Sequence, residues 1–448
     1  SRTMKKSLGA VAVAAAVALS LSACSGSSSS AESAKGEISY WLWDANQLPA
    51  YQQCADDFTK ANPDIKVKIT QRGWDDYWST LTNGFVGGTA PDVFTNHLSK
   101  YPEYAAKKQL LSLDDAVAKD GIKLESYTKG LPELWVGQDG KRYGLPKDWD
   151  TIGLFYNKAM LASAGITEEQ MKDLTWNPED GGTYEKVIAH LTVDKNGVRG
   201  DEAGFDKNNV AVYGAAMPTT WWAVYVPAVL AHGGQFVSTD LTKSMLDSKE
   251  ATAAFDALTK PVLEGIWAPR SFQQTLNGNG PVWTSGKAAI TCTVRAAIPG
   301  LRPNIKDDWD VAHFPKGPAK RVTGMGTFGF ALTTKAKNPD AAWKFLEYKY
   351  SEEGQKLITS QYASVPAMKR FYNSPFWRDL PGPPYNNDVF VDAFAYGTTP
   401  PRLPFYSTGP FRQAVTDGIL GIVLGQTTPE QVVANIEQTL NAFLKERK

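Results

Sequence analysis

The sequence predicts an α/β protein with more than one domain. Short apolar strands alternate with helices in the first hundred residues, an order typical of parallel strands in an α/β layer. The chain has 448 residues, which exceeds the length that one hydrophobic core usually organises. A two-domain α/β architecture is therefore the expected fold class.

The N-terminal residues have the pattern of a secretory signal. Two lysines precede an apolar run over 8–19, which is too short to span a bilayer. The run ends in Leu21-Ser22-Ala23-Cys24, which resembles the lipobox of bacterial lipoproteins, where the signal is cut before a cysteine that carries lipid. We expect a signal peptide over 1–23, lipid on Cys24 and a Ser/Gly-rich tether over 24–36. An ordinary signal peptide with a chance cysteine, or an uncleaved anchor, is the alternative.

The elements after the tether follow in a regular order. Residues 38–43 are expected to form a strand, and residues 65–69 alternate polar and apolar side chains as a second strand. A short third strand is expected over 91–94. The helices between them are expected over 49–61 and over about 75–85.

Two later helices carry recognisable start signals. Asn338-Pro339 places a capping residue before a proline at the first helical position. Thr428-Pro429-Glu430-Gln431 has the form of a capping box, and apolar residues recur after it at helical spacing. We therefore expect the C-terminus to be a packed helix, and the proline-rich stretch 381–404 to be an ordered irregular connection.

Composition excludes several classes of function. The 47 basic and 47 acidic side chains balance and form no basic stripe, so we expect no nucleic-acid partner. The four histidines are widely separated, and no pair has metal-ligand spacing. Cys54 and Cys292 lie in segments expected to be buried, and we expect two free thiols rather than a disulfide.

One loop has oxygen ligands around a glycine turn. Asp194-Lys195-Asn196-Gly197 is followed by Asp201 and Asp206, and the pattern is similar to the first half of a calcium loop without its final glutamate. We keep two interpretations open: a structural calcium site at Asp194, Asn196, Asp201 and Asp206, or a solvated loop. No other cofactor is expected.

The unusual feature of the composition is its aromatic content, with 14 Trp, 18 Tyr and 19 Phe. Trp43-Asp44 follows the first predicted strand, Trp74 follows the second, and Asn96-His97 follows the third. Ligands in open α/β sheets bind beyond the carboxyl ends of strands. Flat rings beside short polar groups suit a sugar, whose ring faces carry C–H bonds and whose rim carries hydroxyls.

Four stretches, which occur along the chain in the expected order, carry a resemblance to a known family. They are GKRYGLPKDWDT at 140–151 followed by LFYNK at 154–158, GTAPDVF at 88–94, SGKAAI at 285–290, and the run from 324–331 through NPDAA and SEEGQ to 355. Together they resemble the family 1 extracellular solute-binding proteins, the carbohydrate-binding components of ABC importers, whose best-known member is maltose-binding protein.

The resemblance implies two lobes of a periplasmic-binding-protein-like fold, with three hinge crossovers and a ligand cleft between the lobes. The crossovers are expected around Asp148, around 315–324 and around 364–367. On this pattern the first lobe holds 37–148 and 316–364, and the second holds 149–315 and 365–448.

The resemblance also implies further ligand contacts. Asp148 and Trp149 fall where the first crossover lines the cleft, and the tandem Trp221-Trp222 is expected to turn at least one ring toward it. Trp283 and Arg295 flank the SGKAAI strand, while Gly324-Met325-Gly326 lets the backbone approach the ligand. The full set of expected contacts is Trp43, Asp44, Trp74, Asn96, Asp148, Trp149, Trp221, Trp222, Trp283, Arg295, Gly324, Met325, Gly326 and Arg402.

The implied function is capture of a sugar or oligosaccharide outside the cytoplasm and its delivery to the membrane subunits of an ABC importer, without catalysis. The protein is expected to be a monomer held by lipid at the outer face of the cytoplasmic membrane. Two alternatives remain: a lipid-anchored glycoside hydrolase, and a binding protein for a non-sugar solute such as a polyamine. Asp148 and Asp150 lie too close in sequence to flank a scissile bond well.

Overall fold

The computed structural model describes residues 35–219, 221–359, 364–379, 381–399 and 410–446. The expected signal peptide, the lipidation site Cys24, almost all of the tether and Arg402 lie outside these residues. In the part of the chain that is described, no helix combines the length and the apolar composition needed to cross a membrane.

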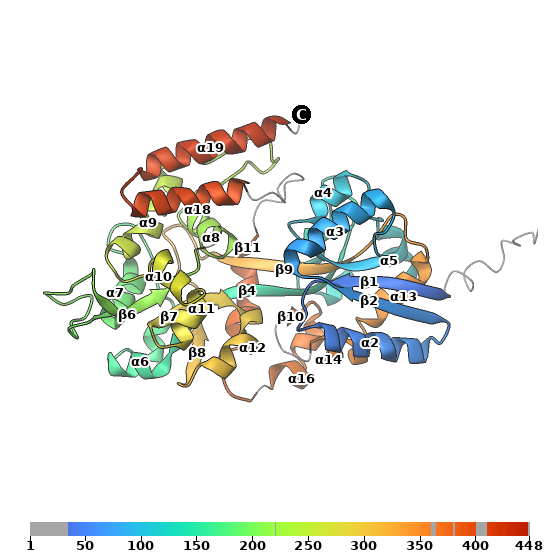
Figure 1. The fold of residues 1–448 in the computed structure, drawn as a ribbon, viewed down its shortest axis with the longest axis horizontal. Coiled ribbons are helices and arrows are strands. Elements are labelled where there is room, and N and C mark those ends of the chain that lie inside the picture. The colour runs from blue at the N-terminus through green and yellow to red at the C-terminus, as the bar shows by residue number, and fades with distance from the viewer. Residues whose placement is uncertain (1–34, 220, 360–363, 380, 400–409, 447–448) are drawn as a thin grey trace, which may run out of the picture.

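Two α/β lobes lie side by side along the long axis of the molecule (Figure 1). In the first lobe, β1 (Gly36–Leu42) pairs in parallel with β2 (Ile65–Gln71) and with β3 (Val93–His97). Helices α2 (Leu48–Ala61) and α3 (Trp74–Gly87) connect these strands. The predicted alternation of strands and helices is confirmed, with boundaries shifted by a few residues.

Two strands run through both lobes and join them (Figure 1). They are β4 (Leu145–Asn157) and β9 (Thr323–Leu332), which pair antiparallel with a bulge in β4. In the first lobe β9 also pairs with β3, and in the second lobe β4 also pairs with β7 (Ala288–Val294) and β8 (Trp309–Ala312). A third segment, β10 (Val365–Pro366), pairs with the middle of β4. Three segments of chain therefore meet where the lobes join.

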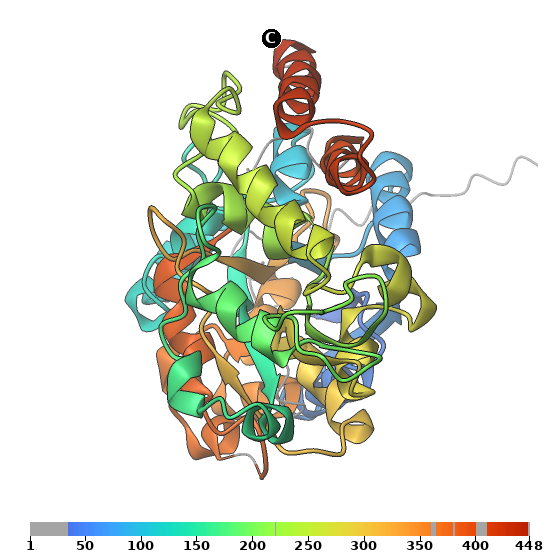
Figure 2. The same ribbon diagram turned by 90° about the vertical axis from the view of Figure 1, so that its left-hand side faces the viewer.

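The second lobe is built on β7 and its parallel neighbour β6 (Val210–Ala216), with β5 (Val193–Asp194) at the edge. Helices α18 (Pro410–Val423) and α19 (Pro429–Glu446) pack on α9 (Lys249–Leu263) at one end of this lobe (Figure 2). The remaining elements are α4 (Tyr101–Ala106), α5 (Asp114–Asp120), α6 (Lys158–Ser163), α7 (Gly182–Leu191), α8 (Val226–Ala231), α10 (Arg270–Thr275), α11 (Asn279–Thr284), α12 (Ile298–Leu301), α13 (Pro339–Tyr348), α14 (Glu352–Ile358), α15 (Lys369–Tyr372), α16 (Pro375–Arg378), α17 (Asp388–Asp392) and β11 (Gly397–Thr398).

The two helix starts differ from each other in their caps. The Thr428 hydroxyl accepts a hydrogen bond from the Gln431 backbone amide at 3.3 Å. This is one of the two hydrogen bonds of the predicted capping box. Asn338 precedes α13 with Pro339 at the first position, but its side chain makes no cap. Its amide donates to the Glu37 carbonyl at 3.2 Å instead, which ties α13 to the start of β1.

The apolar side chains form cores that divide the lobes on one face and join them on the other. One core belongs to the second lobe and includes α7, α8, α9, α18 and α19. A second core lies under α3 and α4 in the first lobe. A third runs beneath both lobes, from α2 and α13 through α16 and α17 to α11 and α12. Because this third core extends under both lobes, the chain positions at which each lobe begins and ends stay a prediction.

The two described cysteines are both free and buried. Cys54 lies on α2 in the first lobe and Cys292 lies on β7 in the second. The prediction of two free thiols is confirmed.

Candidate ligand-binding cleft

Four rings form an aromatic wall at the edge of the first lobe: Trp43, Trp74, His97 and Phe328. The Trp43 centroid lies 5.1 Å from that of Trp74 and 5.5 Å from that of Phe328, and both contacts are edge-to-face. The His97 ring packs on Trp74 at 5.6 Å and on Phe328 at 5.4 Å. Trp74 is 41% exposed, although a large apolar side chain is normally buried. The wall therefore offers an indole to solvent from a rigid support.

The sequence builds this wall because two parallel strands end at one edge. Trp43 follows β1 and His97 ends β3, so their side chains meet at the carboxyl edge of the sheet. Tyr77 lies behind Trp43 at 5.2 Å, and its hydroxyl donates to the Thr95 carbonyl at 2.6 Å. The Gln71 amide donates to the Trp43 carbonyl at 2.9 Å. These bonds fix the rings before any ligand arrives.

Polar groups lie beside the wall. Asp44 is half-buried, and one of its carboxylate oxygens accepts the Asn46 amide at 2.9 Å. The Ser99 backbone N–H donates to His97 Nδ1 at 3.0 Å, which places the imidazole proton on Nε2. Asn96 is fully buried, with its Oδ1 accepting the His97 amide at 2.9 Å. Of the residues predicted at the strand ends, Trp43, Asp44 and Trp74 therefore lie at the wall, whereas Asn96 lies behind it.

The carboxyl groups at the crossing of β4 are buried. Asp148 is 7% exposed and pairs with Lys147 Nζ at 2.7 Å, while its Oδ1 has no hydrogen-bond partner among the described residues. Burial raises the pKa of Asp148, although Lys147 acts in the opposite direction. Asp150 is 3% exposed and accepts the amides of Arg295 and Ala296, both at 2.9 Å. Burial raises the pKa of Asp150 to about 7.

Three residues predicted to contact ligand instead lie in the core in this conformation. Trp149 is fully buried, and its indole N–H donates to the Thr128 hydroxyl at 3.1 Å. Trp283 is fully buried, and its N–H donates to the Ala289 carbonyl at 3.1 Å. The Arg295 guanidinium is buried over the Trp377 ring at 4.2 Å. All three side chains are therefore buried in this conformation, and the two indole N–H groups are bonded inside the protein.

The middle of β9 forms the base of the space between the lobes. Gly324 pairs with Thr398 of β11, and Met325 is buried beneath Gly397. Gly326 pairs with Asp150 and is partly exposed to solvent. The other two predicted residues, Gly324 and Met325, are buried. The segment Trp221–Tyr225, one π-helical turn, contacts β9. The structure does not describe the side chains of Trp221 and Trp222, and Arg402 lies outside the described residues.

The calcium-like loop does not form a metal centre. The Asp194 carboxylate accepts backbone amides of Asn196 and Val198, both at 2.9 Å, and of Asp206 at 2.8 Å. Asp201 pairs with His190 at 2.9 Å. Across the described residues, no group of three or more His, Cys, Asp or Glu side chains is placed to hold a metal ion. The calcium interpretation is corrected: backbone N–H groups already occupy the oxygens that the ion would need.

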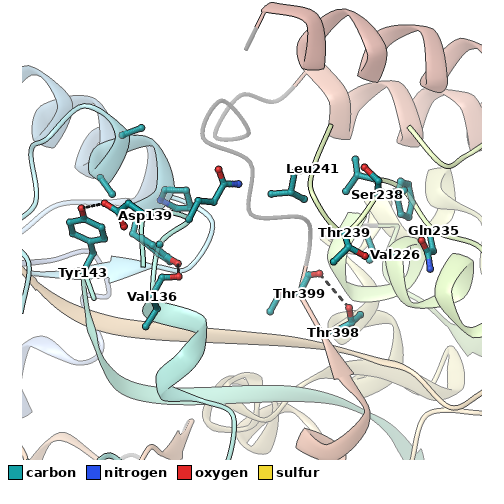
Figure 3. Close-up of a pocket in the computed structure, with 18 of the residues that line it drawn as sticks. Val136, Asp139, Tyr143, Val226, Gln235, Ser238, Thr239, Leu241, Thr398 and Thr399 are labelled. Carbon is teal, nitrogen blue, oxygen red and sulfur yellow. Dashed lines mark hydrogen bonds between the residues drawn. The ribbon is translucent and has the colours of Figure 1, made fainter. Parts of the chain in front are cut away.

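A cavity of about 650 Å³ lies between the lobes (Figure 3). In the first lobe its walls come from α4 and from the loop that includes Val136, Asp139 and Tyr143. In the second lobe they come from α8 and the turn 235–241, and Thr398 and Thr399 close the space near β9. None of these residues was predicted to contact ligand, because they come from segments far apart in the sequence that meet only in the fold.

The sequence profile of the bacterial extracellular solute-binding protein family matches residues 53–384. This chain belongs to that family. A lactose-binding protein of Rhizobium radiobacter is 30% identical over 351 residues, which cover 73% of this chain and 74% of that protein. The maltotriose-binding protein of Pyrococcus abyssi is 23% identical over 431 residues, 93% of this chain and 83% of that protein. The predicted family is confirmed.

Solved structures of solute-binding proteins share the fold. An ABC substrate-binding protein from Listeria monocytogenes, in complex with cycloalternan, matches with a TM-score of 0.77 at 22% identity, over 92% of this chain and 99% of that one. A maltose-bound protein from T. maritima matches with a TM-score of 0.70 at 18% identity, over 91% and 99%. At these identities the comparison shows the two-lobe architecture of solute-binding proteins.

Proposed function

We propose that this solute-binding protein captures an uncharged sugar or oligosaccharide between its lobes and delivers it to an ABC importer. The aromatic wall is the observation that carries the proposal. A saccharide ring exposes a face of C–H bonds, which packs against an indole, and a rim of hydroxyls, which needs small polar groups. Trp74 supplies the exposed indole, and Asp44 and His97 supply an acceptor and a donor beside it.

The expected affinity follows from the number of rings. Each stacking contact contributes about 0.5–1.5 kcal/mol beyond the burial of area. Two such contacts and several hydroxyl bonds, of which those to a carboxylate are the stronger, amount to roughly −8 kcal/mol, or micromolar affinity. That strength lets a receptor bind a scarce nutrient and still release it to a transporter.

Closure of the lobes explains how binding is signalled. On the face of α3, α4, α8 and α18 the two lobes have separate cores, so they can approach without breaking apolar packing. On the opposite face one continuous core joins them. We expect ligand binding to bring the two lobes together on the first face, with the joined core on the opposite face as the hinge. This closure excludes water and presents a new outer surface to the membrane subunits.

The enzyme alternative has little structural support. Hydrolysis of a glycosidic bond needs two carboxyl groups on opposite sides of an accessible bond. Asp148 and Asp150 are buried at 7% and 3% exposure, and Asp150 is held by two backbone amides. We therefore propose a receptor that releases its ligand unchanged and needs no cofactor.

The N-terminal sequence supports a proposal for where in the cell the protein acts. We propose that residues 1–23 direct export, that Cys24 carries lipid, and that the tether holds a monomeric receptor at the outer face of the cytoplasmic membrane. The pattern Leu21-Ser22-Ala23-Cys24 supports this proposal.

Calorimetric titration of the full chain with a saccharide panel tests the function, with the solutions analysed afterwards for products. We expect saturable binding at micromolar concentration and recovery of intact saccharide. Binding of putrescine or spermidine with no saccharide bound would favour the polyamine alternative. Appearance of shorter saccharides would overturn the receptor assignment.

A further inference from the structure

The first strands of the first lobe begin at an edge that lies away from the aromatic wall. β1, β2 and β3 are parallel, so their amino ends meet at one edge of the sheet, opposite the carboxyl edge that carries the wall. β9 ends at the same edge, because Leu332 pairs with Val93 at the start of β3. This amino edge lies at the end of the molecule away from the second lobe (Figure 1).

A hollow of about 220 Å³ opens at the amino edge, between the end of α3, the end of α4 and the loop after β9. Three exposed lysines line it, Lys107, Lys108 and Lys335, and no acidic side chain is among its described lining residues. Lys107 pairs with Glu103 at 3.1 Å, whereas Lys108 and Lys335 form no ion pair within the described part of the chain. The hollow therefore carries an excess of positive charge.

Lys108 occupies a position that a glycine would fit better. Its φ is 57°, and the amides of Lys108 and Gln109 bond to the carbonyls of Ala105 and Tyr104, both at 3.0 Å. These bonds form a Schellman motif at the end of α4, in which the left-handed residue is usually glycine because a Cβ crowds the backbone. An exposed lysine at such a position points to a use for its charge.

Two neighbours of the lysines suit a lipid surface. The side-chain oxygen of Gln109, which lines the hollow, is buried without a hydrogen-bond partner among the described residues. An amide can turn so that its NH₂ group donates to a phosphate oxygen. Val86, in the turn of α3 between Phe85 and Gly88 of the hollow, is 82% exposed. Basic residues beside an exposed apolar side chain favour the boundary between lipid headgroups and acyl chains.

The amino edge is also where the expected tether joins the first lobe. Gly36 opens β1, and the Asn338 side chain, which follows the loop that carries Lys335, donates to the Glu37 carbonyl at 3.2 Å. From Cys24 to Gly36 the chain spans at most about 43 Å when fully extended. Lipid on Cys24 would therefore hold the amino edge near the membrane.

We propose that the amino edge rests on anionic phospholipid of the membrane that anchors the chain, with a headgroup phosphate among the three lysines of the hollow. The inference rests on the proposed membrane location and adds the surface that faces lipid. Glu37 and Asp64 are exposed on the side of β1 and β2, so the contact uses the side of α4. An importer subunit is the competing occupant, but it must sense closure of the lobes, and this edge belongs to one lobe. In this orientation the aromatic wall faces away from the lipid.

Sedimentation of the full chain with vesicles tests the inference. Every protein used carries Cys24→Ala, so that no lipid is attached. The probes are vesicles of phosphatidylcholine alone and of phosphatidylcholine mixed with phosphatidylglycerol. Binding to the first measures what the apolar leader contributes, and the gain with the second measures charge. We expect a gain with the anionic vesicles that shrinks as added salt shortens the Debye length.

Variants locate the charge that produces the gain. Lys108→Asn combined with Lys335→Gln is expected to weaken binding to the anionic vesicles by at least about fivefold, because such a surface attracts each nearby lysine. The melting temperature should not fall, since Asn tolerates the left-handed region. Val86→Ser is expected to weaken vesicle binding as well. The matched control combines Lys195→Gln with Lys207→Gln, two exposed lysines of the second lobe outside the hollow.

The outcomes are distinct. A gain with anionic vesicles that falls in the Lys108 and Lys335 variant, and not in the control, supports the inference. No gain, or an equal loss in both variants, overturns it. Phosphate binding without vesicle binding, seen by calorimetric titration with inorganic phosphate, would assign the hollow to a dissolved anion and also overturn it. Saccharide capture and lipidation of Cys24 are measured separately, by saccharide titration and by palmitate labelling, so they stand or fall on their own.

Discussion

Trp74 differs from the buried tryptophans Trp149 and Trp283 in the exposure of its ring. A buried indole needs a partner for its N–H, and Trp149 and Trp283 each have one at 3.1 Å. Trp74 keeps 41% of its surface exposed while three neighbouring rings, Trp43, Trp78 and His97, hold it at 5.1–5.6 Å. An exposed ring held in place by others is what a stacking platform requires.

Replacing Trp74 by alanine tests that platform. We expect Trp74→Ala to weaken saccharide binding by about 1–2 kcal/mol, or roughly tenfold, because a stacking contact and its buried area are lost. The melting temperature should change little, since much of the ring is exposed. Calorimetric titration and thermal unfolding measure the two quantities. The control is Tyr385→Ala, which removes another exposed aromatic ring, on the second lobe, and should leave binding intact. Equal losses of saccharide affinity in both variants would contradict the platform role.

The sequence could indicate the wall but not which tryptophans are buried. Trp43 and Trp74 were found because each follows a strand and precedes an acidic residue, a pattern visible locally. Trp149 also precedes an acidic residue, but its ring is covered by Phe394, which comes from a segment far along the chain. The two ring centroids lie 4.9 Å apart. Its burial depends on that distant contact, which no local pattern encodes.

At the level of elements, local periodicity predicted the first lobe and missed the junction. The strands at β1, β2 and β3 follow from alternation and from helices of suitable length between them. No strand was predicted at β4, because all 13 of its residues are buried and show no alternation; the resemblance indicated only a crossover around Asp148. The cavity was missed because its walls come from loops and short helices.

The packing of β6 on α7 depends on a glycine. A Cβ at Gly214 would lie 2.0 Å from the Ile188 carbonyl oxygen, a backbone atom that cannot rotate away. We expect Gly214→Ala to lower the free energy of unfolding by about 1–3 kcal/mol, measured by urea denaturation. Gly87→Ala is the control, because Gly87 lies in α3 with no atom within 4 Å of an added Cβ. A similar loss in both variants would contradict the steric argument.

A carboxyl pair links α5 and α13 and makes stability depend on pH. Asp120 accepts the Trp343 indole N–H. Burial, followed by the neighbouring Asp120, raises the pKa of Glu347 from 4.5 to about 7. A raised pKa means that the folded state holds the proton more tightly, so this stabilisation is complete below about 4.5 and is lost as the pH rises to about 7.

Glu347→Gln removes this titration and keeps a hydrogen-bonding side chain. We expect the urea midpoint of the wild type to fall more than that of the variant between about pH 5 and about pH 8. Glu352→Gln, at a solvent-exposed glutamate of α14, should follow the wild type. Parallel pH profiles for the wild type and Glu347→Gln would refute the role of the pair.

At the scale of the whole molecule, the asymmetry of the cores is the basis of the closure that we propose. Apolar packing joins the lobes beneath the crossing strands and leaves them separate above, where the aromatic wall and the cavity lie. The family relationship and the two-lobe fold agree with this arrangement. We expect the proposed saccharide ligand to enter on this face.

The proposed location at the membrane depends on Cys24. Cells that express the chain should incorporate labelled palmitate into the wild type and not into Cys24→Ala, because the thiol is the expected acceptor. A Cys54→Ala variant should be labelled like the wild type, since Cys54 is buried in α2. Unlabelled wild type would favour an ordinary signal peptide.

A crystal structure of the full chain grown with a saccharide that binds in solution tests the central claim most directly. The account predicts one saccharide between the lobes, with a ring face packed on Trp74, Asp44 accepting a hydroxyl, and the two walls closer than in the unliganded chain. A saccharide bound outside the cleft, or one in the cleft with no contact to Trp43 or Trp74, would contradict it.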